Sequence, residues 1–242
     1  AKGLVKRDII RVITPGTVID ETSLEAGRSN FCAGIWLDER YAALCACDIS
    51  TGQMSATAFE GPQRLEHLLN ELGRFSPAEA VMNDGAFFDE TLTGVLESKF
   101  HCHREKRKVP MEAAERLTRE QFGEDACARL PRENPAAVLA LGTLLNYLHE
   151  TQKTDLSHID SLDFYRQGQF MELDLTARRN LELTETLRGK GKRGSLLWVL
   201  DKTKTAMGAR CLRGFLERPL LDVNAIRRRQ GAVQALVDET MT

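Results

Sequence analysis

The spacing of apolar residues first changes along this sequence at Gly61-Pro62. Before that point, three β-rich runs follow one another with three residues between neighbours, which is enough for a hairpin but not for a crossover. After it, apolar residues recur at every third or fourth position, which is the period of an amphipathic helix. The chain must therefore begin as an antiparallel meander and then cover it with helices. The predicted strands are 31–37, 41–49 and 53–59.

Helical and extended patterns then alternate through the rest of the first half. A helix comes first, then a short strand at 79–82, a helix at 87–97, a charged strand at 100–108 and a helix that Pro110 opens. The order βββαβαβα fits a mixed five-stranded sheet with helices on its faces, the plan of the α/β ribonuclease H-like fold. The apolar face of the first helix is predicted to consist of Leu65, Leu68, Leu69, Leu72 and Phe75.

Two prolines near 129–134 mark a boundary, beyond which the pattern is mainly α-helical. Asn134 is predicted to cap a helix that Pro135 opens. The stretch 155–174 is predicted to be extended. Further helices are predicted at 175–188, with Leu181, Leu183 and Leu187 in the core, at 195–217 with a break near 202–205, and at 223–239 with Asp222 as its cap.

The composition is that of a globular protein, with 42% apolar and 28% charged residues among 242. Apolar runs fall short of the ~20 residues that cross a bilayer, and the first residues lack the pattern of a signal peptide. Six cysteines are too few for a disulfide scaffold in a chain of this length. We therefore expect a cytoplasmic protein with reduced thiols and no membrane partner.

The sequence offers little support for a phosphate-binding loop. The run 189–194 matches G-x-G-x-x-G, but that motif needs a strand before its glycines, and the preceding residues have a helical pattern. A Walker A loop needs G-x-x-x-x-G-K-[ST], which no stretch of the sequence supplies. We predict no cofactor-binding residues in this chain.

Metal and nuclease chemistry find equally little support. In His101-Cys102-His103, neighbouring side chains of a strand would face opposite sides of the sheet. A two-metal nuclease needs converging carboxylates, but the first strand has no acid before Asp38, and Asp48 and Asp84 stand at turn signals, where capping is their usual role. We predict no catalytic or metal-binding residues, and that Cys45 and Cys47 face the core.

A series of short motifs runs in order along essentially the whole chain. They are VKR and RVITPGT within 5–17, DISTG at 48–52, TQ and LSHI within 151–159, MELD and RRNLEL within 171–183, GSLLWVLD at 194–201, TAMGAR at 205–210 and PL at 219–220. In this combination, the sequence resembles the MutS family of DNA mismatch repair ATPases.

The resemblance implies a middle fragment of such a protein. Residues 1–29 would be a linker and the last strand of the mismatch-binding domain, 30–130 the connector domain, and 131–242 the first part of the helical core (lever) domain. It implies a non-enzymatic segment that couples mismatched-DNA binding to an ATPase and offers a surface to MutL. ATP, Mg²⁺, duplex DNA and homodimer formation would belong to the longer parent protein.

Within this resemblance, the helix after Pro110 is the candidate docking element. Met111, Ala114, Leu117 and Phe122 are predicted to face the sheet, which leaves a charged, solvated face opposite them. The predicted partner-binding residues are Glu112, Glu115, Arg116 and Arg119. Two alternatives remain at this point, a ribonuclease H-like metal-dependent nuclease and a MutS relative that acts in recombination.

Overall fold

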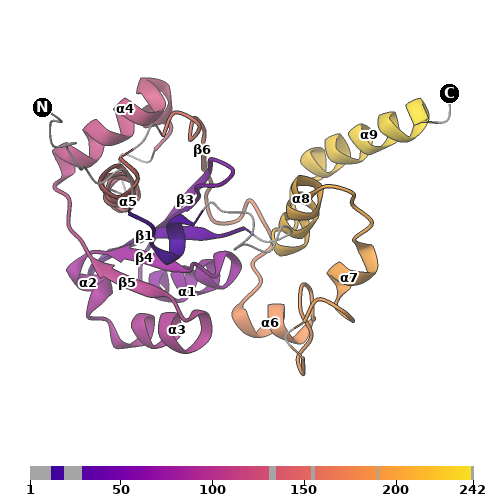
Figure 1. The fold of residues 1–242 in the computed structure, drawn as a ribbon, viewed down its shortest axis with the longest axis horizontal. Helices are drawn as coiled ribbons and strands as arrows, with labels where there is room; N and C mark the ends of the chain where they lie inside the picture. The colour runs from indigo at the N-terminus through magenta and orange to yellow at the C-terminus, as the bar shows by residue number, and fades with distance from the viewer. Residues whose placement is uncertain (1–11, 19–28, 131–134, 154–155, 190, 241–242) are drawn as a thin grey trace, which may run out of the picture. The chain divides into compact units, whose positions relative to one another are not determined.

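A computed structural model describes residues 12–18, 29–130, 135–153, 156–189 and 191–240 (Figure 1). The described residues form two compact units, the first ending at Phe164 and the second beginning at Tyr165. Of the strand predicted within 1–29, only Val12 and Ile13 lie among the described residues, and neither is in a strand. A short 3₁₀ helix, η1, occupies Pro15–Thr17, where the sequence predicted a turn.

The first unit is built on a mixed six-stranded sheet with the order β5-β4-β1-β2-β3-β6. The first three strands form the predicted antiparallel meander, and β4 pairs in parallel with β1. The five predicted strands are confirmed, and a sixth lies in the stretch predicted to be extended, so the expected count of five is corrected to six. The strands are β1 Phe31–Leu37, β2 Tyr41–Asp48, β3 Gln53–Glu60, β4 Glu79–Met82, β5 His103–Lys106 and β6 Leu162–Phe164.

Helices cover both faces of this sheet (Figure 1). One face packs on the helices α1 and α3, where the predicted residues Leu68, Leu72 and Phe75 are buried. The other face packs on α5, and here Cys45 and Cys47 are fully buried, as predicted. The helices of the first unit are α1 Arg64–Phe75, α2 Asp84–Phe87, α3 Glu90–Phe100, α4 Met111–Arg129 and α5 Ala136–Gln152.

The position of α5 corrects the predicted boundary near residue 130. This helix packs directly on the sheet, and a Cβ atom added to Gly34 of β1 would come within 2.3 Å of the Ala140 carbonyl oxygen. Leu141, Leu144, Leu145 and Leu148 are all buried. Because α5 covers one of the two faces of the sheet, the boundary between compact units lies at Phe164 rather than near 130. Its predicted cap, Asn134, is outside the described residues.

The position of α4 corrects a second prediction. Ala114 is buried, and Leu117 and Phe122 are partly buried against the core, but α4 packs mainly on α5 instead of facing the sheet directly. The physical reason is that α5 is apolar nearly all round and takes the place against the sheet, which leaves its outer side for the narrower apolar face of α4.

The second unit is helical, as predicted, but its first helix is shorter than expected. Helix α6 ends at Asn180 instead of continuing to 188, and Leu181 and Leu187 are 58% and 43% exposed, so their predicted core positions are wrong. The predicted break near 202–205 separates α7 from α8, and Asp222 caps α9 by accepting from the amide of Ala225. The helices are α6 Leu175–Asn180, α7 Leu196–Leu200, α8 Ala206–Glu217 and α9 Val223–Thr240.

The connection between α7 and α8 is expected to loosen in acid. Lys192 and Thr203 donate to the Asp201 carboxylate and lower its pKa to about 2. Since this pKa lies below the ordinary value for aspartate, the hydrogen bonds to the Asp201 carboxylate stabilise the folded state fully above about pH 4. This stabilisation is lost as the pH falls through about 2. An NMR titration should therefore show the Thr203 amide shifting in this range. Asp201→Asn should abolish the change in the Thr203 amide signal. The control Asp160→Asn replaces an exposed side chain of the first unit and should not alter that signal.

None of the helices in the described ranges is long and apolar enough to span a bilayer.

Candidate partner-binding surface and strand-end pocket

The outer face of α4 carries the charged residues that the sequence singled out. Arg116 pairs with Glu120 along the helix at 3.8 Å, and Arg119 pairs with Glu124, just beyond a kink at Gly123, at 2.6 Å. Such solvated pairs add little stability, so this face is available for contacts with a partner. All four predicted residues are exposed on it: Glu112, Glu115, Arg116 and Arg119.

The position of this face is fixed by the packing beneath it. A Cβ atom added to Gly142 of α5 would lie 2.3 Å from the Ala114 Cβ, so the two helices approach as closely as their backbones allow. On the opposite, packed side of α4, the Gln121 side-chain amide donates to the carbonyl oxygens of Leu156 and Ile159, at 3.0 and 2.7 Å. The charged surface is therefore rigidly attached to the core of the first unit.

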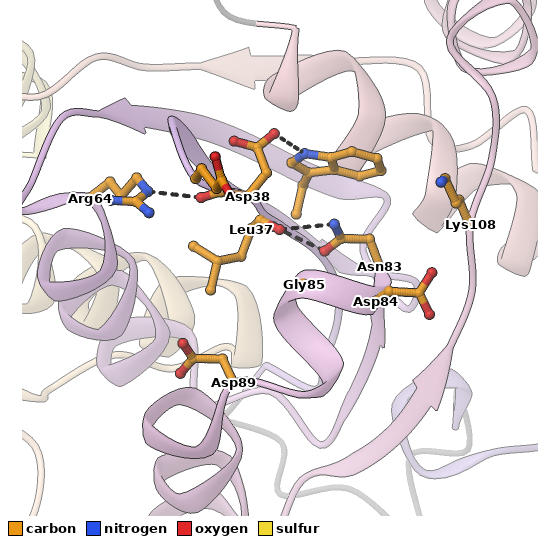
Figure 2. A pocket seen from close by; sticks show the side chains of 10 residues that line it. Leu37, Asp38, Arg64, Asn83, Asp84, Gly85, Asp89 and Lys108 are labelled. Carbon is orange, nitrogen blue, oxygen red and sulfur yellow. Dashed lines mark hydrogen bonds between the residues drawn. The ribbon is translucent and has the colours of Figure 1, made fainter.

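A separate pocket of about 480 Å³ opens at the carboxyl ends of β1 and β4 (Figure 2). Ligands of α/β proteins commonly bind at the carboxyl ends of strands. If the chain were a metal-dependent nuclease, carboxylates in this pocket would be its candidate metal ligands. Asn83 shapes the pocket by donating to the carbonyl oxygen of Leu37 and accepting from its amide, at 2.9 and 3.0 Å. The other lining side chains include Trp36, Asp38, Glu39, Arg64, Asp84, Asp89 and Lys108.

Three of the four carboxylates that line this pocket have local structural partners. Burial raises the pKa of Asp38, but hydrogen bonds from the Trp36 indole and two backbone amides outweigh it and lower the pKa. Asp89 caps α3 by accepting from the amide of Leu92 at 2.8 Å. Asp84, predicted to be a cap, pairs instead with Lys106 at 3.1 Å, while Asn83 caps α2. Asp38 thus stabilises a turn, Asp89 caps a helix and Asp84 forms an ion pair.

The remaining sequence candidates are also dispersed. His101 ends α3 in a left-handed conformation, and Cys102 is buried, which with the nearby Glu79 raises its pKa to about 12. Asp48 accepts from the Ser50 amide and hydroxyl, the capping role predicted for it. Across the described ranges, no three His, Cys, Asp or Glu side chains converge as metal ligands. The glycine motif at 189–194 follows turns, not a strand.

Comparison with known proteins agrees with this architecture. Residues 30–160 match the family model of MutS domain II, and residues 176–242 match that of MutS domain III. The chain belongs to the MutS family. The first match covers nearly all of the sheet unit, including α5, and the second falls within the helical unit.

Its MutS relatives are considerably longer than this chain. It is 39% identical to the DNA mismatch repair protein MutS of Acetivibrio thermocellus, over all of this chain and 28% of that protein. It is 42% identical to the MutS protein of Symbiobacterium thermophilum, over 98% of this chain and 27% of that protein. The chain thus spans little more than a quarter of the length of these MutS proteins.

Sequence reasoning missed one polar cluster in the MutS domain II unit. The Glu79 side chain, at the start of β4, is completely buried. Its Oε2 atom accepts from the Gly16 amide at 3.0 Å and from the Thr14 hydroxyl, and its Oε1 atom accepts from the Tyr147 hydroxyl at 2.7 Å. The only signal in the sequence was a single acid in a short buried strand.

Proposed function

We propose that this chain is the connector and first lever segment of a MutS mismatch repair protein. In this role it has no catalytic residues of its own and works in the cytoplasm as part of the longer, homodimeric protein. It transmits conformational change between the part that reads mismatched DNA and the ATPase that uses ATP and Mg²⁺. The names of its relatives favour repair over recombination.

The strand order supports a ribonuclease H-like plan for the connector. An antiparallel meander lies beside two parallel strands, with β1 in the middle, and helices lie on both faces. In this proposal the connector acts as a rigid body, and the pocket carboxylates Asp38 and Asp89 stabilise a turn and a helix end.

The observation that carries the proposal is the layered packing of sheet, α5 and α4. The inner side of α5 lies against β1 at Gly34, and its outer side lies against α4 at Ala114. Close-packed interiors transmit displacements instead of absorbing them. A shift of the sheet would therefore carry the charged face of α4 with it, and we propose that this face docks MutL.

Reversing two charges on α4 tests the docking proposal. In the full-length protein, Glu115→Arg with Arg116→Glu should slow association with MutL roughly tenfold, because peripheral charges act mainly on the association rate. Binding of mismatched DNA and the ATPase rate should stay unchanged. Association measured by surface plasmon resonance at two salt concentrations would show the effect.

The matched control swaps an exposed pair elsewhere in the same unit, Glu97→Arg with Arg104→Glu, whose side chains lie 3.3 Å apart. This variant should bind MutL normally. If both swaps slow MutL equally, or if the α4 swap leaves MutL association unchanged, α4 is not the docking element.

A further inference from the structure

The buried Glu79 carboxylate links segment 12–17 to the rest of the first unit. Both oxygen atoms of the Glu79 carboxylate accept hydrogen bonds, and each accepts from a different part of the chain. Oε2 accepts from Thr14 and Gly16 in the segment, and Oε1 accepts from Tyr147 on α5. On the same oxygen, His103 of β5 contributes a contact of 3.2 Å through Nδ1.

Steric fit shows that the segment is seated on the strands themselves. A Cβ atom added to Gly16 would lie 2.7 Å from the Glu79 Cβ and 3.0 Å from the Cys32 Cβ. The turn is also closed internally, since the Thr14 amide donates to the Thr17 hydroxyl at 2.8 Å. Glu79 therefore contacts a preformed turn that has no space to slide over the sheet.

Two further hydrogen bonds extend this attachment. The Val12 amide donates to the carbonyl oxygen of Thr151, near the end of α5, at 2.8 Å. The Asn30 side chain donates to the carbonyl oxygen of Pro15 at 2.9 Å. Segment 12–17 thus contacts α5, β4 and the start of β1, and the Glu79 carboxylate hydrogen-bonds both the segment and α5.

The chemistry of a buried carboxylate makes this attachment strong. A buried polar group that loses a hydrogen-bond donor keeps its full desolvation penalty, because water does not replace the donor. Displacing the turn would remove the Thr14 and Gly16 donors from Oε2 together. The segment should therefore remain attached under loads that would detach an ordinary surface turn.

We infer that Glu79 is a positioning residue that locks segment 12–17 to β4 and α5, so that a pull on the preceding chain moves α5 and the charged face of α4 with it. This inference rests on the proposed coupling function and names the residue through which the coupling enters the first unit. It concerns a contact within the chain and can be tested without DNA, ATP or MutL.

The test measures amide hydrogen exchange by NMR in the 242-residue chain. In Thr14→Val, which removes one donor to Oε2, the Gly16 amide should exchange at least tenfold faster, while the amides of β2 keep their protection. Thr14→Ser retains the hydroxyl and should restore slow exchange. Glu79→Gln should act on Gly16 as Thr14→Val does, and the double variant should add little, because both changes break one contact.

Tyr147→Phe is the matched control, since it removes a hydroxyl donor to the same carboxylate from the α5 side. It should lower the melting temperature, but the exchange rate of the Gly16 amide should not rise relative to the rates of the β2 amides. Equal loss of protection at Gly16 and β2 in Thr14→Val, or unchanged Gly16 exchange, would overturn the inference. The α4 charge reversal tests docking separately, so failure here is distinguishable from failure of the proposed function.

Discussion

Replacing Gly142 by alanine is expected to destabilise the first unit by about 2–3 kcal/mol, at the upper end of the range for overpacked cores. The added methyl group would overlap Ala114, whose Cβ and Cα lie at 2.3 and 2.4 Å from its position. Neither atom is the end of a flexible side chain, so α4 has to move away from α5. Urea denaturation followed by circular dichroism would measure the loss.

Gly94→Ala provides the control for helix propensity. Gly94 lies inside α3, and an added Cβ would meet nothing within 4 Å. Because alanine favours the helix, this variant should gain about 0.5–1 kcal/mol. If Gly142→Ala proves as stable as Gly94→Ala, the close approach of α4 and α5 is not what fixes the charged surface.

The same substitution has a functional consequence. In the full-length protein, Gly142→Ala should weaken MutL association although no charged residue of α4 is altered. A smaller effect of the α4 charge reversal in the Gly142→Ala background would show that both changes act on one surface.

Asn83→Ala is expected to cost about 3 kcal/mol, since it leaves buried backbone groups without partners, each worth roughly 1–3 kcal/mol. The Asn83 side chain accepts from the Leu37 amide and donates to the Leu37 carbonyl oxygen (Figure 2). It also accepts from the Ala86 amide at 3.2 Å. It thereby ties the end of β1 to the start of α2. Thermal unfolding would report the loss as a lower melting temperature.

Asn30→Ala is the matched control for this change. The Asn30 side chain makes one exposed hydrogen bond, to the carbonyl oxygen of Pro15, so its loss should cost under about 1 kcal/mol. Similar losses for the two variants would contradict the role given to Asn83 at the strand end.

Much of the first unit could be predicted because its signals are local. The meander was placed to within one residue at every strand end, since period-2 patterning and three-residue connections leave little freedom of register. The exposed face of α4 followed from helical periodicity in the same way. In the second unit, apolar residues after Asn180 suggested a longer helix, but the chain turns there and Glu182 adopts a left-handed conformation.

In the first unit, the sequence by itself determined where the meander and the main helices form and which side of these helices is apolar, because these features depend on neighbours within a few positions. Only the tertiary structure decided what each apolar side contacts. It placed α5 in the first unit and between α4 and the sheet, where Gly34 and Gly142 allow close approach. It also buried Glu79, because the donors that make such burial tolerable come from Thr14, Gly16 and Tyr147, more than sixty residues away along the chain.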